Sequence, residues 1–167
     1  MIRVLQGFGQ IAVYGAFAAL IGYFADSPRY EYFPSDKAAV TLSFAHGAEH
    51  KGDCRRLSRT ELQKLAPNMR KPMSCPRERL PVVVKLELDG RNLYEATLPP
   101  TGLSGDGPSH VFKRFVVPTG RHTLVARLRD TKRESGYDYT ATKAINLAPA
   151  QSLAIDFRAD IGGFIFE

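Results

Sequence analysis

The side chains best suited to chemistry gather in a short stretch, residues 46–54. His46, His50 and Cys54 follow one another at intervals of four residues. On a helix this spacing places all three on one face, and imidazole and thiolate groups are ligands that zinc accepts. The stretch also contains Gly47 and Gly52 and lacks an apolar period, which disfavours a helix. We therefore predict no metal site, and keep a periplasmic metal-binding or metal-delivery protein using His46 and His50 as an alternative.

Cys54 and Cys75 are the only cysteines in the chain. In an oxidising compartment the simplest arrangement is one disulfide between them, which excludes Cys54 as a metal ligand. Closing a loop of this size stabilises the fold by roughly 3 kcal/mol in the chain-entropy model. The sequence therefore predicts a Cys54–Cys75 disulfide in a domain outside the cytoplasm.

Catalytic signatures are missing. The sequence contains no G-x-S-x-G, H-E-x-x-H or P-loop pattern, and no C-x-x-C-H site for covalent haem. Glu87 and Glu95 are the nearest candidates for a carboxylate pair, on either side of the turn at Asp89–Gly90. Exposed strand faces carry such residues routinely. We predict that the protein is not an enzyme and binds no cofactor.

Residues 4–25 (VLQGFGQIAVYGAFAALIGYFA) carry no charge. A bilayer core about 30 Å thick needs roughly 20 apolar residues in a helix. Cleavage after Ala25 would place Tyr23 where signal peptidase requires a small residue, so we predict that residues 1–25 are an uncleaved transmembrane anchor. Positive charges on the two sides of this segment are too similar to orient it. The two cysteines favour a single-pass protein of the bacterial inner membrane with its C-terminal domain in the periplasm.

Small residues recur at helical spacing along this segment. They let a second helix approach closely, and a side-chain amide in lipid needs a partner. The predicted helix-packing residues are Gln10, Ala12, Gly15, Ala16, Ala19 and Gly22. The alternative is that small residues are simply common in spans and that Gln6 and Gln10 lie near the headgroups.

The rest of the chain is predicted to be one β domain. A polar linker with two prolines, residues 26–37, precedes a domain at residues 38–167. Alternating apolar residues predict about seven strands with turns between them. The expected strands are 40–44, 82–88, 92–98, 111–117, 122–129, 137–147 and 153–157, followed by a short apolar run at 164–166. This pattern is typical of an antiparallel sandwich, with a small barrel as the alternative.

Two segments carry a family resemblance. LDGRNLYEATLPP, at residues 88–100, and FKRFVVPTGRHTLVARLRD, at residues 112–130, resemble the strand–turn–strand pattern of immunoglobulin-like and PEGA-like extracytoplasmic modules. The resemblance covers about residues 82–130. It implies an immunoglobulin-like β-sandwich with a binding or structural role. The whole chain also resembles small single-pass proteins of Gram-negative bacteria that accompany inner-membrane complexes.

Between the first two strands lies an insertion, residues 46–79, which holds both cysteines. Ser58 and Glu61 form a capping-box pattern for one short helix, which Pro67 ends. From residue 51 to residue 79 there are nine basic and three acidic side chains, an excess equal to the formal net charge of +6 of the whole protein. We predict a surface for an acidic protein or anionic lipid headgroups, formed by Arg55, Arg56, Arg59, Arg70, Lys71, Arg77 and Arg79. The alternative is a solvated loop whose arginines bind nearby carbonyl oxygens.

These features together predict a non-catalytic accessory subunit or assembly factor of an inner-membrane protein complex. Its partners would be integral membrane subunits and not nucleic acid. By analogy, we expect a respiratory or photosynthetic electron-transfer complex. The alternative to a subunit, besides a metal-delivery protein, is a module that binds an envelope polymer.

Overall fold

The computed structural model describes residues 2–27, 34 and 36–167, and the chain divides into two units. The first unit comprises Met1–Pro34 and the second Ser35–Glu167. Most of the predicted linker, residues 28–33 and 35, lies outside the described residues. Each unit is described by itself.

The first unit is one α-helix, α1, spanning Ile2–Asp26. Within it Gln6–Ala25 has a mean hydropathy of 1.5. Every described side chain from Phe8 to Ala25 is exposed. The helix is thus long and apolar enough to cross a membrane, properties that a signal sequence near an N-terminus shares.

The second unit is mainly β. One four-stranded sheet has the order β10-β9-β1-β6 and the other the order β5-β4-β7-β8. The bounds of the first sheet are β1 Lys37–His46, β6 Ser109–Pro118, β9 Ser152–Arg158 and β10 Gly163–Phe166. The bounds of the second are β4 Val82–Leu88, β5 Arg91–Leu98, β7 Gly120–Arg129 and β8 Tyr139–Leu147. All seven expected strands form, and the short apolar run at 164–166 lies in β10.

One strand pair corrects the prediction of a purely antiparallel fold. β1 pairs with β9 in parallel, with Val40 opposite Leu153, whereas β1 pairs with β6 in the antiparallel sense. The first sheet is therefore mixed. A parallel pair needs a long crossover connection, and here the whole second sheet lies between β1 and β9 in the chain.

The hairpin between β4 and β5 forms as its turn predicts. Asp89 and Gly90 have positive φ angles of 51° and 77°. Two successive positive φ angles define the tight turn whose twist matches that of paired strands, and Asp and Gly are residues that tolerate it.

Both sheets contribute to one apolar cluster. Leu42 and Ile155 from the first sheet and Leu86, Leu124 and Leu128 from the second are fully buried. In β4 buried and half-buried residues alternate along the whole strand, as the period of two requires. This shared core holds the strand ends in place.

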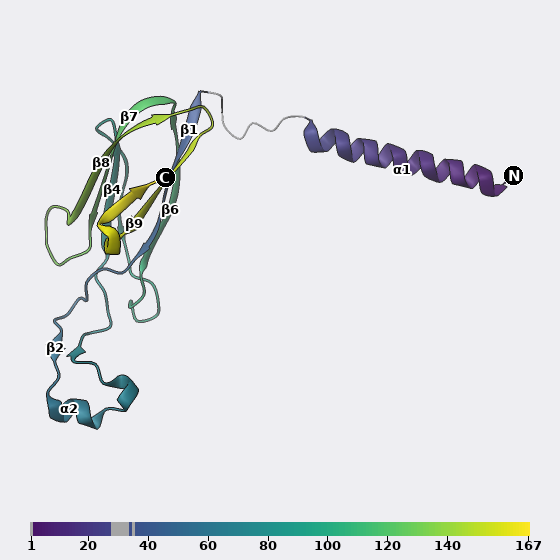
Figure 1. Ribbon diagram of the computed structural model, residues 1–167. Coiled ribbons are helices and arrows are strands. Elements are labelled where there is room, and N and C mark those ends of the chain that lie inside the picture. Colours follow the sequence, from purple (N-terminus) through teal and green to yellow (C-terminus); the bar gives the residue numbers. More distant parts are fainter. Residues whose placement is uncertain (1, 28–33, 35) are drawn as a thin grey trace. The chain divides into compact units, whose positions relative to one another are not determined.

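β1 connects the point where the chain enters the β unit to the insertion. It begins at Lys37, where the chain enters the β unit, and ends at His46, where the insertion leaves it. The two ends of this ten-residue strand are about 30 Å apart. The insertion, which contains β2 Arg55–Arg56, α2 Arg59–Lys64, the 3₁₀ turn η1 Pro67–Met69 and β3 Met73–Ser74, projects beyond the ends of the long strands (Figure 1).

Candidate docking surface

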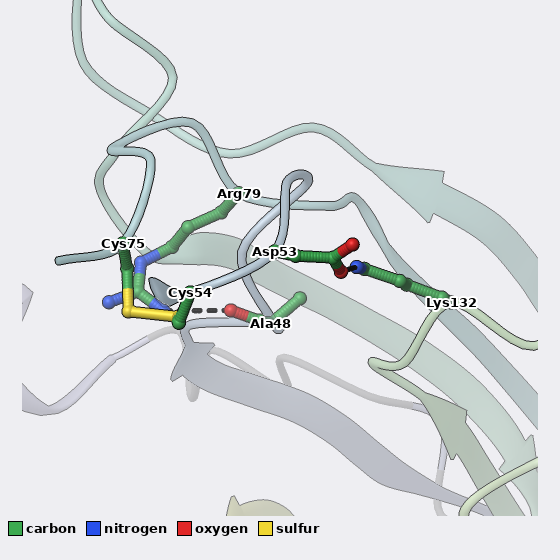
Figure 2. Close-up of a disulfide and its surroundings, with 6 residues drawn as sticks. All are labelled: Ala48, Asp53, Cys54, Cys75, Arg79 and Lys132. Atoms are coloured by element: carbon green, nitrogen blue, oxygen red, sulfur yellow. Dashed lines mark hydrogen bonds and ion pairs between the residues drawn. A yellow bond between two sulfur atoms is a disulfide. The ribbon is translucent and has the colours of Figure 1, made fainter. Parts of the chain in front are cut away.

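The insertion is closed by a disulfide at its neck, which we define as residues 47–54 and 75–79. Cys54 and Cys75 are bonded, with Cα atoms 4.1 Å apart, as predicted. Figure 2 shows the disulfide, which joins the two segments of the neck beside Arg79. Twenty-one residues separate the two cysteines, so the bond fixes the base of everything beyond it.

Arg79 forms a second set of contacts that stabilises the neck. Its Nη1 donates to the carbonyl oxygen of Ala48 at 2.7 Å and its Nε to that of Asp106 at 3.1 Å (Figure 2 shows the first bond). Its backbone N–H donates to the carbonyl oxygen of Gly105. The sequence predicted Arg79 as a partner-binding residue, but the structure commits its guanidinium to backbone carbonyl oxygens inside the chain.

Further contacts anchor the neck to the β unit. Nε2 of His46 lies 2.6 Å from Oδ2 of Asp130, and both side chains are largely buried. The N–H of Glu49 donates to the carbonyl oxygen of Asp130. The ammonium group of Lys132 donates to the carboxylate of Asp53 (Figure 2), and this hydrogen bond lowers the pKa of Asp53. The root of the insertion is therefore held at several points.

The helical face that a metal site would need is not formed. His46 is the last residue of β1, His50 forms an isolated bridge with Arg79, and Cys54 is in the disulfide. Across residues 2–27, 34 and 36–167, no group of three or more His, Cys, Asp or Glu side chains is arranged to hold a metal ion.

Beyond the neck the chain forms a distal lobe, residues 55–74. Arg55 pairs with Ser74 and Arg56 with Met73 in a two-residue ladder. At the start of α2 the predicted capping box is present: the hydroxyl of Ser58 accepts from the N–H of Glu61, whose Oε2 accepts from the N–H of Ser58 at 2.9 Å. Hydrogen bonds from the Ser58 backbone and then from Arg55 lower the pKa of Glu61 to about 2. The lobe thus has its own hydrogen-bonded framework.

Most of the predicted binding residues are exposed. Arg55, Arg56, Arg59, Arg70, Lys71 and Arg77 all have exposed side chains. Arg55 pairs with Glu61 and Arg77 with Asp106, while Nε of Arg70 donates to the carbonyl oxygen of Leu65. Within the described part of the chain, the side chains of four basic residues make no hydrogen bond or ion pair: Arg56, Arg59, Lys64 and Lys71. These four cations are available to a partner.

The small-residue stripe of α1 is open as well. An added Cβ at Gly15 or Gly22 would meet no atom of the chain within 4 Å. Gln10 and the alanines of the predicted stripe, Ala12, Ala16 and Ala19, are likewise exposed. The close backbone approach that small residues permit is therefore sterically available on this helix.

The carboxylates considered as an acid–base pair are neutralised by cations. Lys85 lies 3.1 Å from Glu87 and 3.6 Å from Glu95, and Arg127 lies 2.6 Å from Glu87. Hydrogen bonds from Arg127 and then Lys85 lower the pKa of Glu87. A paired carboxylate whose pKa is lowered, as in Glu87, is a poor general acid at neutral pH.

Two features of this surface have no counterpart in the sequence predictions. The loop between β5 and β6 supplies Asp106 to the neck, and the distal lobe has a groove lined by Met69 and Met73. The sequence does contain a signal for the groove, because Met69 and Met73 lie in a segment rich in basic residues. The role of Asp106 has no such signal because Asp106 is 29 residues from Arg77.

Comparison with known proteins adds no family: the sequence matches no family model, and no curated protein is significantly similar to it.

Proposed function

We propose that this protein is a membrane-anchored, non-catalytic docking subunit of a larger membrane complex. α1 would be the anchor, and the basic insertion would bind an acidic surface on a protein partner. Tethering makes the second contact effectively intramolecular, so that each contact can be weak alone. The disulfide supports a location on the oxidising side of the membrane, which in a Gram-negative cell is the periplasm.

One observation carries the proposal: the attachment of the chain and the basic insertion are at opposite ends of β1. Lys37 and His46 are the first and last residues of that strand, about 30 Å apart. A surface held that far from the point of attachment suits a partner that stands out from the bilayer.

We further infer that the two sheets form an immunoglobulin-like sandwich around the shared core. Alternating burial in β4, β7 and β9 supports a face-to-face arrangement. A sandwich is a rigid support. It would hold the neck, through His46 and Asp130 at the ends of β1 and β7, in a fixed position for docking.

Affinity purification of the full-length, tagged chain from mild detergent tests the proposal. We expect membrane subunits to copurify in fixed stoichiometry with the wild-type protein. Recovery of the chain alone, under conditions that keep other membrane complexes intact, would overturn the docking role.

A matched pair of charge reversals tests the surface. Arg56→Glu with Arg59→Glu replaces exposed cations whose side chains make no hydrogen bond or ion pair within the described residues, so the fold is expected to persist. Lys113→Glu with Arg121→Glu makes the same change in charge on β6 and β7. We expect the first variant to lose the partner and the second to retain it. Equal loss in both would indicate a nonspecific charge effect and contradict a docking surface on the insertion.

A further inference from the structure

We propose that the groove of the distal lobe binds an extended peptide segment of the partner in which acidic and apolar residues alternate. This inference rests on the proposed docking function and names the part of the partner that is recognised. The groove has a volume of about 740 Å³, within the range of sites that hold small ligands or short peptide stretches.

The groove has an apolar lining that is exposed to solvent. Met69 and Met73 are 61% and 47% exposed, and Leu57 and Leu65 lie half-buried beside them. Methionine side chains are flexible and polarisable, so they adapt to varied apolar partners. Four apolar residues therefore line the groove beside exposed basic side chains: Leu57, Leu65, Met69 and Met73. This lining indicates a site for apolar side chains of a ligand.

The charged part of the lining has a single sign. Lys71, Arg77 and Arg79 line the groove, and neither aspartate nor glutamate does. The side chain of Lys71 has no hydrogen bond or ion pair within the described part of the chain. Arg77 is 80% exposed, and its Nη2 lies 2.7 Å from Asp106, which shows that a carboxylate fits against this guanidinium. A peptide segment that carries carboxylates is therefore complementary in charge to this lining.

The combination of lining side chains distinguishes between possible ligands. Cations and apolar side chains lie in the same groove. This combination suits a peptide better than a phosphate, which would gain nothing from the methionines.

Peptide binding to the full-length, detergent-solubilised protein tests the inference. The probe is a fluorescent decapeptide of alternating glutamate and leucine. Its controls are decapeptides in which serine replaces leucine or lysine replaces glutamate. We expect the glutamate–leucine peptide to bind and both controls to bind about tenfold more weakly or not at all. Equal binding of the glutamate–serine peptide would overturn a role for the apolar lining.

Two matched substitutions locate the site. Lys71→Glu places a like charge in the groove, and we expect about tenfold weaker peptide binding. Lys113→Glu makes the same change on β6, outside the groove lining, and we expect a change of less than about twofold. Met69→Ser with Met73→Ser is expected to weaken binding about tenfold while leaving the charges in place. Unchanged binding in Lys71→Glu, or an equal loss in Lys113→Glu, would contradict the groove.

The groove and the docking role can fail separately. If the Lys71→Glu and methionine variants still copurify the partner while Arg56→Glu with Arg59→Glu loses it, the groove inference is wrong and the docking role stands. If the wild-type chain recovers no partner, the docking role fails. Displacement of the peptide by vesicles containing phosphatidylglycerol, with no effect of vesicles of neutral lipid, would assign the groove to headgroups and overturn the peptide proposal.

Discussion

Arg79 and Ala48 face each other across the neck of the insertion, and Nη1 of Arg79 donates to the carbonyl oxygen of Ala48 at 2.7 Å. The same guanidinium reaches Asp106 in the loop between β5 and β6. One side chain thereby ties together three chain segments that are remote in sequence. Arg79 belongs to a basic segment, but its guanidinium stabilises the fold by hydrogen bonds to backbone carbonyl oxygens.

We therefore expect Arg79→Ala to destabilise the β unit by about 1–3 kcal/mol, because two carbonyl oxygens in a part-buried site lose a charged donor. Arg77→Ala is the control, since its ion pair with Asp106 is solvent-exposed and its loss should cost less than about 1 kcal/mol. The chain has no tryptophan, so urea unfolding is best followed by circular dichroism. Equal destabilisation by the two substitutions would contradict a structural role for Arg79.

Reduction of the Cys54–Cys75 disulfide should loosen the insertion and spare the sheets. The loss corresponds to roughly 3 kcal/mol of loop-closure free energy, confined to the loop that the bond closes. Amide hydrogen exchange measures this directly. The N–H of Leu57, which donates to the carbonyl oxygen of Pro72, should exchange faster after reduction, whereas amides of β4 and β7 should not change. Uniform acceleration across the β unit would show that the disulfide stabilises the whole fold.

The capping box of α2 should respond to acid. The pKa of Glu61 in the folded protein is about 2, below its usual value of 4.5. A lowered folded-state pKa means that the stabilising contribution is complete above about pH 4.5 and is lost as the pH falls through the folded value. We expect the NMR signals of residues 58–61 to shift as the pH falls below 3, while the core strands keep their positions. In Glu61→Gln this acid transition should be absent; its persistence would assign it to another group.

Gly52 is required by the close approach of Pro76. A Cβ at position 52 would lie 2.6 Å from Cγ of Pro76, nearer than van der Waals contact allows. Gly52→Ala should destabilise the neck by about 1–3 kcal/mol, the usual cost of overpacking. The double variant Gly52→Ala with Pro76→Ala removes the clashing atom and leaves Cβ of residue 76 at 3.4 Å, so stability should be partly restored. Thermal unfolding of the three proteins provides the test, and a double variant no more stable than Gly52→Ala would contradict the steric explanation.

The strands were predictable because their sequences repeat a simple period. Val82, Val84, Leu86 and Leu88 alternate with less buried neighbours, and the Asp89–Gly90 turn fixed where β4 ends and β5 begins. The capping box at Ser58 was equally local, since it depends on two residues three positions apart. Features encoded within a few consecutive residues were therefore accessible to sequence reasoning.

Pairing between remote segments was not accessible. Alternation in β1 and β9 shows that both are strands but does not show that they pair, or in which direction. His46 and Asp130 are 84 residues apart, and nothing near either residue points to the other. β2 and β3 contain two residues each, too few for any period to appear. Sequence reasoning predicted the basic charge and the disulfide of the candidate site but did not predict its groove.

The placement of β1 also has a mechanical consequence. A pull between the attachment of the chain at Lys37 and the root of the insertion at His46 acts along this strand. Because both ends of this load lie on one extended strand, the covalent backbone of β1 carries the pull, and the ladders to β6 and β9 are not forced to slide. Tension between these two points would therefore leave the pairing of the sheets intact.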